Sequence, residues 1–350
     1  MKLKKLLSVA LVTVMSASVL VGCSSGEKKE AAGSADGEKK VFKIAMVTDT
    51  GGVNDESFNQ SAWAGLEKIK KEFGEDKVKV KYLESKQDAD YVPNVETLVE
   101  EDTDLIIGVG FKLADAIEEA AKNYPENQFA LVDAAYEKQP ANVTSLLFED
   151  HVSSYLTGVI AAKLSESHKV GFIGGISGEV IDRFDYGFRA GVEATDPNAK
   201  VSVQYTNSFT DMAKGKSIAN QMHKDGVDVI FTAAGACGIG AIEAAKENGK
   251  KAIGVDQDQN KLAPDNVITS AMKNIDIAVF DAAKSMIEGK YKPGQVIVNT
   301  LDMGGVGIAK TSDKNVQPDV LKYVNEIAEK IKKGEIKVPE NEKEYKELKK

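Results

Sequence analysis

Two aromatic side chains and two carboxylates occupy equivalent places in the two halves of this 350-residue sequence. Phe58 and Phe184 each come soon after a predicted strand, near the start of a predicted helix, while Asp133 and Asp256 each follow an apolar strand directly. Two aromatic rings that face each other can stack on a flat ring between them. A carboxylate can accept hydrogen bonds from ring N–H groups or from hydroxyls. These residue types therefore favour the binding of a flat, polar ligand.

Each of these residues also has a purely structural interpretation. Either phenylalanine could belong to the hydrophobic core, and either aspartate could cap the next helix. Lys273 ends a further predicted strand over residues 267–272, where it could enter the site as a neutralising donor or lie exposed. The segment Gly235-Ala-Cys-Gly-Ile-Gly240 opens a predicted helix without the spacing of a dinucleotide-binding motif. Gly235 is therefore expected only to let the backbone approach a ligand closely.

The sequence contains few residues or motifs that could support catalysis or metal binding. The three histidines are scattered without metal-ligand spacing, and Cys237 is expected to be a buried structural thiol. No phosphate-binding loop or nucleophile elbow is present. The segment 48–55 is superficially similar to the calcium loop of nucleoside hydrolases, but Gly51 stands where that loop needs a second aspartate. Hydrolase activity is therefore not expected, nor is any other enzymatic activity or a cofactor.

The elements that must position these residues alternate between strand and helix. Runs rich in Val, Ile and Phe are separated by amphipathic helical stretches, which predicts an α/β fold with parallel sheets. The expected strands are 42–48, 78–83, 105–109, 129–132, 170–173, 201–205, 227–231, 252–255, 267–272 and 296–301, and the clearest helices are 56–73, 112–123, 180–194, 239–248 and 276–287.

The sequence also repeats itself at an offset of roughly 125 residues, which indicates an internal duplication. Four pairs of segments carry the repeat: 63–67 with 189–193, 104–110 with 228–235, 116–122 with 241–246, and 130–133 with 253–256. We therefore predict two doubly wound, Rossmann-like lobes joined by a hinge of several crossovers. Ligands of such sheets bind beyond the carboxyl ends of the strands, which would face each other across a cleft.

The predicted lobe boundaries follow from this duplication. The N-terminal lobe is expected to comprise residues 41–149 plus about 267–293. The C-terminal lobe is expected to comprise residues 150–266 plus about 294–340. A chain that crosses repeatedly between lobes could close around a ligand by bending at the crossovers.

The first 40 residues carry a targeting signal. Residues 1–22 combine a lysine-rich start with an apolar run, which is typical of a signal peptide. Leu20-Val21-Gly22-Cys23 resembles the bacterial lipobox and predicts lipidation of Cys23; the alternative is a buried cysteine that merely follows the apolar run. Residues 23–40 are then a flexible tether. The formal net charge is −9, and no basic patch with interleaved aromatics is apparent, so nucleic acid is not an expected partner.

Several motifs, in order, resemble the basic membrane protein (BMP) family of lipoproteins, which includes purine nucleoside receptors of spirochaetes. They are Val47–Gln60, Gly108–Phe111, Phe184–Gly191, Ala233–Gly235 and Gly254–Gln259. The resemblance implies the type I periplasmic-binding-protein fold and the role of substrate-binding component of a nucleoside ABC importer.

The resemblance also implies roles for individual residues. The base would be stacked between Phe58 and a second aromatic, Phe184 or alternatively Phe209. Asp49 and Asp133 would bind the edge of the base, with Asn59 nearby. Asp256 and Lys273 would hold the ribose hydroxyls, and the backbone at Gly235 would approach the sugar.

The expected protein is thus a monomeric lipoprotein anchored on the extracytoplasmic face of the cell membrane. It would capture nucleosides, with purine nucleosides favoured, and deliver them to an ABC permease driven by ATPase subunits. Two other functions stay open: a receptor for another flat ligand such as riboflavin, and a surface adhesin or sensor without transport.

Overall fold

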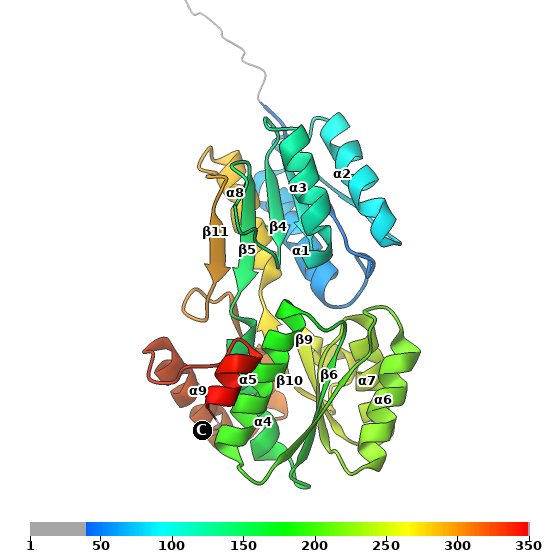
Figure 1. The fold of residues 1–350 in the computed structure, drawn as a ribbon, viewed down its shortest axis with the longest axis vertical. Helices are drawn as coiled ribbons and strands as arrows, with labels where there is room; N and C mark the ends of the chain where they lie inside the picture. Colours follow the sequence, from blue (N-terminus) through cyan, green and yellow to red (C-terminus); the bar gives the residue numbers. More distant parts are fainter. Residues whose placement is uncertain (1–39, 349–350) are drawn as a thin grey trace, which may run out of the picture. The chain divides into compact units, whose positions relative to one another are not determined.

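Residues 40–348, which are the ones described by this computed structural model, contain two six-stranded sheets (Figure 1). The first sheet has the order β11-β5-β4-β3-β1-β2, and all its strands are parallel. Its strands are β1 (Phe42–Val47), β2 (Val78–Leu83), β3 (Leu105–Val109), β4 (Phe129–Val132), β5 (Val143–Phe148) and β11 (Val296–Asn299).

The second sheet has the order β12-β10-β9-β8-β6-β7 and is parallel except for β12, which runs antiparallel to β10. Its strands are β6 (Lys169–Gly174), β7 (Lys200–Tyr205), β8 (Val229–Ala233), β9 (Lys251–Asp256), β10 (Val267–Lys273) and β12 (Val306–Ile308). We call the two sheets with their covering helices the first and second lobes. The predicted fold class, two α/β lobes of mostly parallel strands, is confirmed.

The burial of the strands explains their sequences. Every residue of β3 and of β8 is buried, because helices cover both faces of a central parallel strand. The edge strand β7 alternates exposed and half-buried residues. Continuous apolar runs therefore lie at the centre of each sheet, and alternating sequences lie at its edge.

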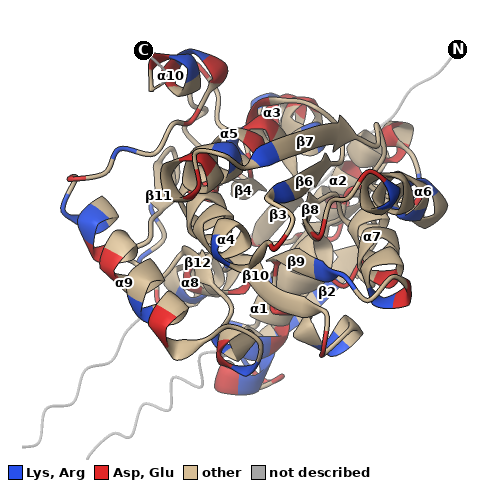
Figure 2. Cartoon of the chain, turned by 90° about the horizontal axis from the view of Figure 1, so that it is seen from below, with Lys and Arg blue, Asp and Glu red and all other residues tan. Residues whose placement is uncertain are grey.

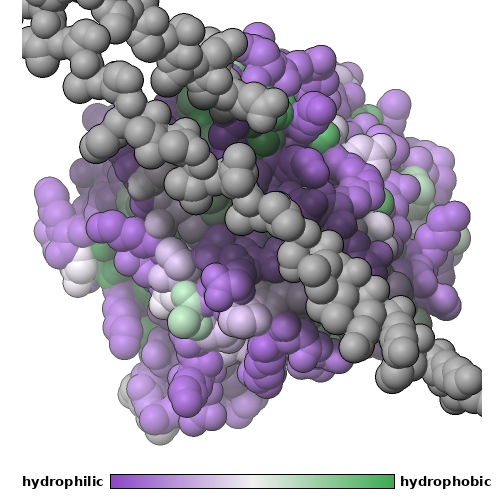
Figure 3. Space-filling view, turned by 90° about the horizontal axis from the view of Figure 1, so that it is seen from above, coloured by the Kyte–Doolittle hydropathy of each residue, from purple (hydrophilic) through white to green (hydrophobic). Residues whose placement is uncertain are grey.

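Helices cover the faces of both sheets. They are α1 (Phe58–Phe73), α2 (Tyr91–Glu100), α3 (Ala114–Asn123), α4 (Asp150–Leu164), α5 (Glu179–Thr195), α6 (Met212–Lys224), α7 (Ala236–Glu247), α8 (Ile275–Ile287), α9 (Pro318–Lys332) and α10 (Glu342–Glu347), with short 3₁₀ segments η1 (Asp88–Asp90), η2 (Phe111–Leu113), η3 (Gln259–Leu262) and η4 (Lys310–Lys314). Figure 2 shows both signs of charge mixed along α9, while the strands are largely uncharged. The face drawn in Figure 3 is mostly hydrophilic where it is not covered by grey atoms.

Glycines bring α4 and α5 into backbone contact. A Cβ at Gly158 would lie 2.3 Å from the carbonyl oxygen of Phe188, and one at Gly191 would lie 2.1 Å from that of Tyr155. Only glycine permits this distance. The close packing fixes α5, which carries several residues of the site described below.

The described chain passes between the lobes at Glu149, at Asn274 and over residues 300–305. Two predicted boundaries are wrong. β10 belongs to the second sheet, because its buried residues extend the ladder beside β9, and β11 belongs to the first sheet, where it pairs with β5. Within the segment predicted for the first lobe, α8 does pack there, against α1, and Tyr291 after it donates its hydroxyl to the carbonyl of Phe129 on β4.

The predicted signal peptide (1–22), the lipidated Cys23 and all but the last residue of the predicted tether lie outside the described residues. Within residues 40–348, no helix is both long enough and apolar enough to cross a membrane.

Candidate functional site

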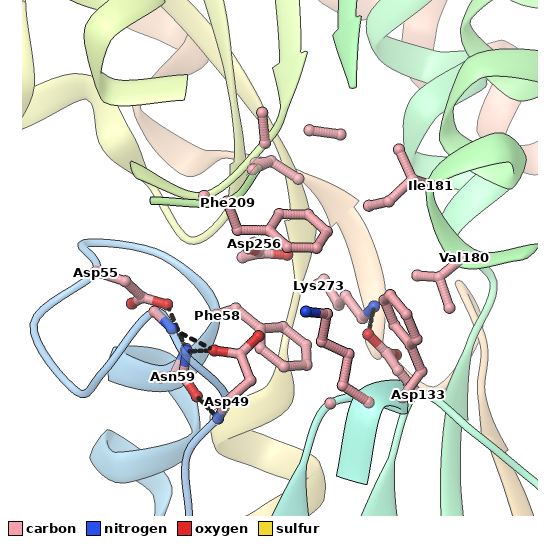
Figure 4. A pocket seen from close by; sticks show the side chains of 18 of the residues that line it. Asp49, Asp55, Phe58, Asn59, Asp133, Val180, Ile181, Phe209, Asp256 and Lys273 are labelled. Atoms are coloured by element: carbon pink, nitrogen blue, oxygen red, sulfur yellow. Dashed lines mark hydrogen bonds and ion pairs between the residues drawn. The ribbon is translucent and has the colours of Figure 1, made fainter. Parts of the chain in front are cut away.

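A cavity lies between the two lobes, at the carboxyl ends of their strands (Figure 4). It encloses about 620 Å³ of space not filled by protein atoms, including the part open to solvent. All eight residues predicted for the site line this cavity: Asp49, Phe58, Asn59, Asp133, Phe184, Gly235, Asp256 and Lys273. The structure thus brings them together, and their roles toward a ligand stay predictions.

The loop between β1 and α1 holds two carboxylates around one amide. The Asn59 side-chain amide donates to Asp49 Oδ1 at 2.7 Å and to Asp55 Oδ2 at 2.9 Å. The backbone N–H of Gly51 also donates to Asp49 Oδ1, at 2.8 Å. Both amide hydrogens of Asn59 are therefore engaged, so Asn59 acts as a positioning residue for Asp49. Burial raises the pKa of Asp49 to about 6, although these hydrogen bonds oppose the shift.

Lys273 lies at the centre of a buried group of charges. Its side chain is 1% exposed, and its Nζ lies 2.5 Å from Asp133 Oδ2 and 3.1 Å from Asp150 Oδ1. Asp150 Oδ2 lies 3.3 Å from Arg183 Nη2. Burial acts to lower the pKa of Lys273, but the carboxylates, Asp133 first, outweigh burial and raise it, so the ammonium stays charged. The alternative of an exposed strand-end lysine is wrong.

Asp133 and Asp256 share an unusual backbone conformation. Their φ angles are +66° and +65°, in the left-handed region that non-glycine residues seldom adopt. Neither caps a helix: Asp258 caps η3 instead, and the element after Asp133 is the strand β5. The helix-cap interpretation is therefore wrong for both. Strained backbone of this kind is concentrated at ligand sites.

Direct contacts join the lobes beside Asp256. The Ser57 hydroxyl of the first lobe donates to Asp256 Oδ2 of the second. Nearby, Gln257 Nε2 donates to Gln60 Oε1 at 2.9 Å, and Gln259 Nε2 donates to the carbonyl of Glu56 at 2.9 Å. These hydrogen bonds hold the start of α1 against the end of β9 beside the cavity.

Aromatic rings from both lobes line the cavity. Phe58 comes from the first lobe and Phe209 from the second, and Figure 4 shows them on facing sides of the cavity. Phe209 also makes an edge-to-face contact with Phe111, with ring centroids 6.4 Å apart. Phe184 is 2% exposed and packs edge-to-face on Phe231 at 6.1 Å. Phe184 thus belongs to the core and to the cavity wall at once.

Gly235 stands at the start of α7 with a φ of +56°. A Cβ there would lie 3.0 Å from the carbonyl oxygen of Phe209, and the backbone N–H of Ala236 donates to that oxygen at 2.8 Å. Glycine is required both by the backbone angle and by the Phe209 loop. This contact positions Phe209 at the cavity, a link that the sequence did not reveal.

Four residues that matter at the site were not among the predicted ones: Asp55, Phe111, Asp150 and Arg183. Arg183 could have been singled out from the sequence, since it is one of only two arginines in the chain. Asp55 lies in the segment that was compared with the hydrolase loop. Within residues 40–348, no group of three or more His, Cys, Asp or Glu side chains is arranged to hold a metal ion.

One prediction concerns the pH dependence of stability. Burial raises the pKa of Asp256 to about 7, and the opposing effects of Lys273 and of the Ser57 hydroxyl do not restore it. Its folded-state pKa thus exceeds its unfolded value, so ionised Asp256 destabilises the fold above pH 7, and this destabilisation fades as the pH falls toward 4. Asp256→Asn should therefore stabilise the unliganded protein at pH 8, and much less at pH 5. Urea unfolding at both pH values measures this, and an equal effect at both would contradict it.

Two α/β lobes, repeated crossovers and a cavity at the strand ends define a two-lobe solute-binding protein of the type I fold. The chain belongs to the Bmp family, ABC transporter substrate-binding protein PnrA-like, which matches residues 42–342. The predicted family is thereby confirmed, and its members are substrate-binding proteins of ABC transporters rather than enzymes.

Individual relatives agree with this assignment. The chain is 44% identical over 357 residues to the CD4+ T-cell-stimulating antigen of Listeria innocua, with 96% of this chain and 99% of the relative covered. It is 38% identical over 355 residues to the ABC transporter nucleoside-binding protein BmpA of Lactococcus lactis subsp. cremoris, with the same coverage. A solved solute-binding protein of an ABC transporter system from Aeropyrum pernix K1 superimposes with a TM-score of 0.79 at 28% identity, covering 88% of this chain and 96% of that one.

Proposed function

We propose that this chain captures nucleosides, purine nucleosides above all, in the cavity between its lobes and delivers them to an ABC permease. The observation that carries the proposal is the combination of aromatic rings from both lobes with buried carboxylates at the strand ends. Aromatic faces suit a base, which stacks with about 1–3 kcal/mol per ring. Carboxylates accept hydrogen bonds from base N–H groups and ribose hydroxyls. The nucleoside-binding relative from Lactococcus lactis supports the assignment.

In the proposed complex, Phe58 forms one face of the stack, and Phe184 or Phe209 forms the other. Asp49 and Asp133 accept hydrogen bonds from the base, with Asn59 holding Asp49 in place. Asp256 and Lys273 bind the ribose hydroxyls, and the backbone at Gly235 approaches the sugar. Lys273 is already held by Asp133, so binding of the ribose adds a partner to an oriented ammonium group.

The proposal includes the setting of the receptor. Cys23 carries a lipid anchor after removal of residues 1–22, and the monomeric protein works on the extracytoplasmic face of the cell membrane. There it hands its ligand to a permease whose ATPase subunits supply the energy. Metabolic labelling with a radioactive fatty acid tests the anchor: Cys23→Ala should lose the label.

Isothermal titration of the full chain, purified in detergent, tests the ligand. Guanosine, adenosine, cytidine, free guanine, ribose and riboflavin form the panel. A nucleoside should bind at least about tenfold more tightly than free guanine or ribose, because each fragment fills only half of the site. Tight binding of riboflavin alone, or no binding across the panel, would reject the nucleoside assignment.

A further inference from the structure

A second cavity adjoins the ligand cavity at Asp133. The two cavities share Phe111, Asp133 and Val180, which line both. We call the second cavity the side chamber. In Figure 4, Asp133 and Val180 lie on the opposite side of the ligand cavity from Asp49 and Asn59. A ligand that spans the cavity from Asp49 thus ends at the wall that the two cavities share.

The shared wall carries a buried acceptor that lacks a partner. Asp133 is 5% exposed, and its Oδ2 is engaged by Lys273. Its Oδ1 is buried without a hydrogen-bond partner among the described residues. An unsatisfied buried acceptor is unfavourable, so a ligand N–H placed here gains a hydrogen bond that the unliganded protein lacks. Because Asp133 lines both cavities, its Oδ1 is the acceptor we assign to a ligand donor there.

The other walls of the side chamber are mainly small or apolar. They include Ala134, Ala135 and Leu147 of the first lobe and Gly178 of the second. Two of its charged lining residues pair with carboxylate partners or each other, since the Arg183 guanidinium lies 3.3 Å from Asp150 and 3.7 Å from Glu179, although Arg183 Nε is buried without a hydrogen-bond partner within residues 40–348. These walls suit an uncharged alkyl or aryl group.

The side chamber also leads to the surface. Ala135 and Glu179, two of its lining residues, are exposed. A group in the side chamber can therefore extend toward solvent at these two residues.

We propose that the side chamber receives an uncharged substituent on the exocyclic nitrogen of the bound base, so that the protein also binds nucleosides modified at that nitrogen. The inference rests on the proposed function, because it takes the base edge to face Asp133. A mono-substituted amine keeps one N–H, which donates to Asp133 Oδ1, while its substituent extends into the side chamber. A disubstituted amine has no N–H and leaves Asp133 Oδ1 without a donor.

Titrations of the full chain in detergent with three adenosines test this inference. The dissociation constant of N6-benzyladenosine should lie within about threefold of that of adenosine. N6,N6-dimethyladenosine should bind at least about tenfold more weakly than adenosine, because the dimethylated amine lacks an N–H donor. The matching pairs of guanosine (N2) and cytidine (N4) are titrated in the same way. If a parent nucleoside binds but its mono-substituted form is more than about tenfold weaker, the inference is rejected and the proposed function stands. If no parent binds, both are rejected.

Variants at the side chamber provide a second test. A Cβ at Gly178 meets no atom within 4 Å, so Gly178→Leu narrows the side chamber without a clash at Cβ. Gly178→Leu should weaken the binding of N6-benzyladenosine at least about tenfold and leave the affinity for adenosine unchanged. Gly307→Leu on β12 is the matched control: its Cβ is equally unobstructed, it lines neither cavity, and neither affinity should change. Equal effects of Gly178→Leu on both ligands, or no effect on either, would overturn the inference; Ala134→Phe repeats the test from the other lobe.

Discussion

Replacing Lys273 with methionine is expected to lower the free energy of unfolding by about 3–5 kcal/mol, the largest stability effect we predict for one substitution. The ammonium group is buried between Asp133 and Asp150, at 2.5 Å and 3.1 Å. Methionine fills a similar volume but supplies no charge, so both carboxylates lose a cation where water cannot replace it. Urea unfolding followed by circular dichroism measures the loss.

A matched control separates burial from charge alone. Lys284 makes a 2.7 Å ion pair with Glu72, but both side chains are at least one-third exposed. Lys284→Met should therefore lower the free energy of unfolding far less than Lys273→Met, because solvent screens an exposed pair. The double variant Lys273→Met/Asp133→Asn should recover part of the stability lost in Lys273→Met, because one uncompensated charge is removed. If Lys273→Met costs no more than Lys284→Met, the cluster does not depend on a buried ion pair.

The internal duplication explains why much of the site could be predicted from the sequence. Parallel strands in two repeated lobes end at equivalent edges, so residues at equivalent offsets from those strands face one cavity. Asp133 and Asp256 show how close the equivalence is, since even their φ angles agree within a degree. A symmetric pair of this kind can be recognised without knowing how the lobes are oriented.

Contacts between distant elements could not be predicted in this way. The apolar run of β10 identified a strand, but its burial pattern fits a central position in either sheet, and the assignment to the first lobe was wrong. Asp150 contacts both Lys273 and Arg183 because α4 packs against α5 and β10. No local spacing encodes that packing. The role of Asn59 was hidden for the same reason, since both its amide hydrogens are engaged only in the folded loop.

Phe58→Ala is expected to weaken nucleoside binding by about 1–3 kcal/mol, which is roughly 5- to 150-fold in the dissociation constant. Phe58 begins α1 and lines the cavity from the first lobe, and the buried ammonium of Lys273 lies 5.4 Å from its ring centroid. Its ring is therefore held beside the groups proposed to bind the ribose. Removing it takes one face from the stack and leaves the carboxylates in place, so titration with the tightest nucleoside of the panel measures the stack itself.

Three further alanine variants show whether that loss is specific. Phe280→Ala removes a partly buried ring on α8 that does not line the cavity, so it should leave affinity unchanged whatever it does to stability. Phe184→Ala and Phe209→Ala identify the second face, because only the ring that stacks should match the loss at Phe58. Phe184 also packs on Phe231, so its variant should lose stability as well, whereas a stacking Phe209 would affect binding far more than folding. If Phe58→Ala binds as tightly as the unmodified chain, the base is not stacked on Phe58, and the two-ring stack is rejected.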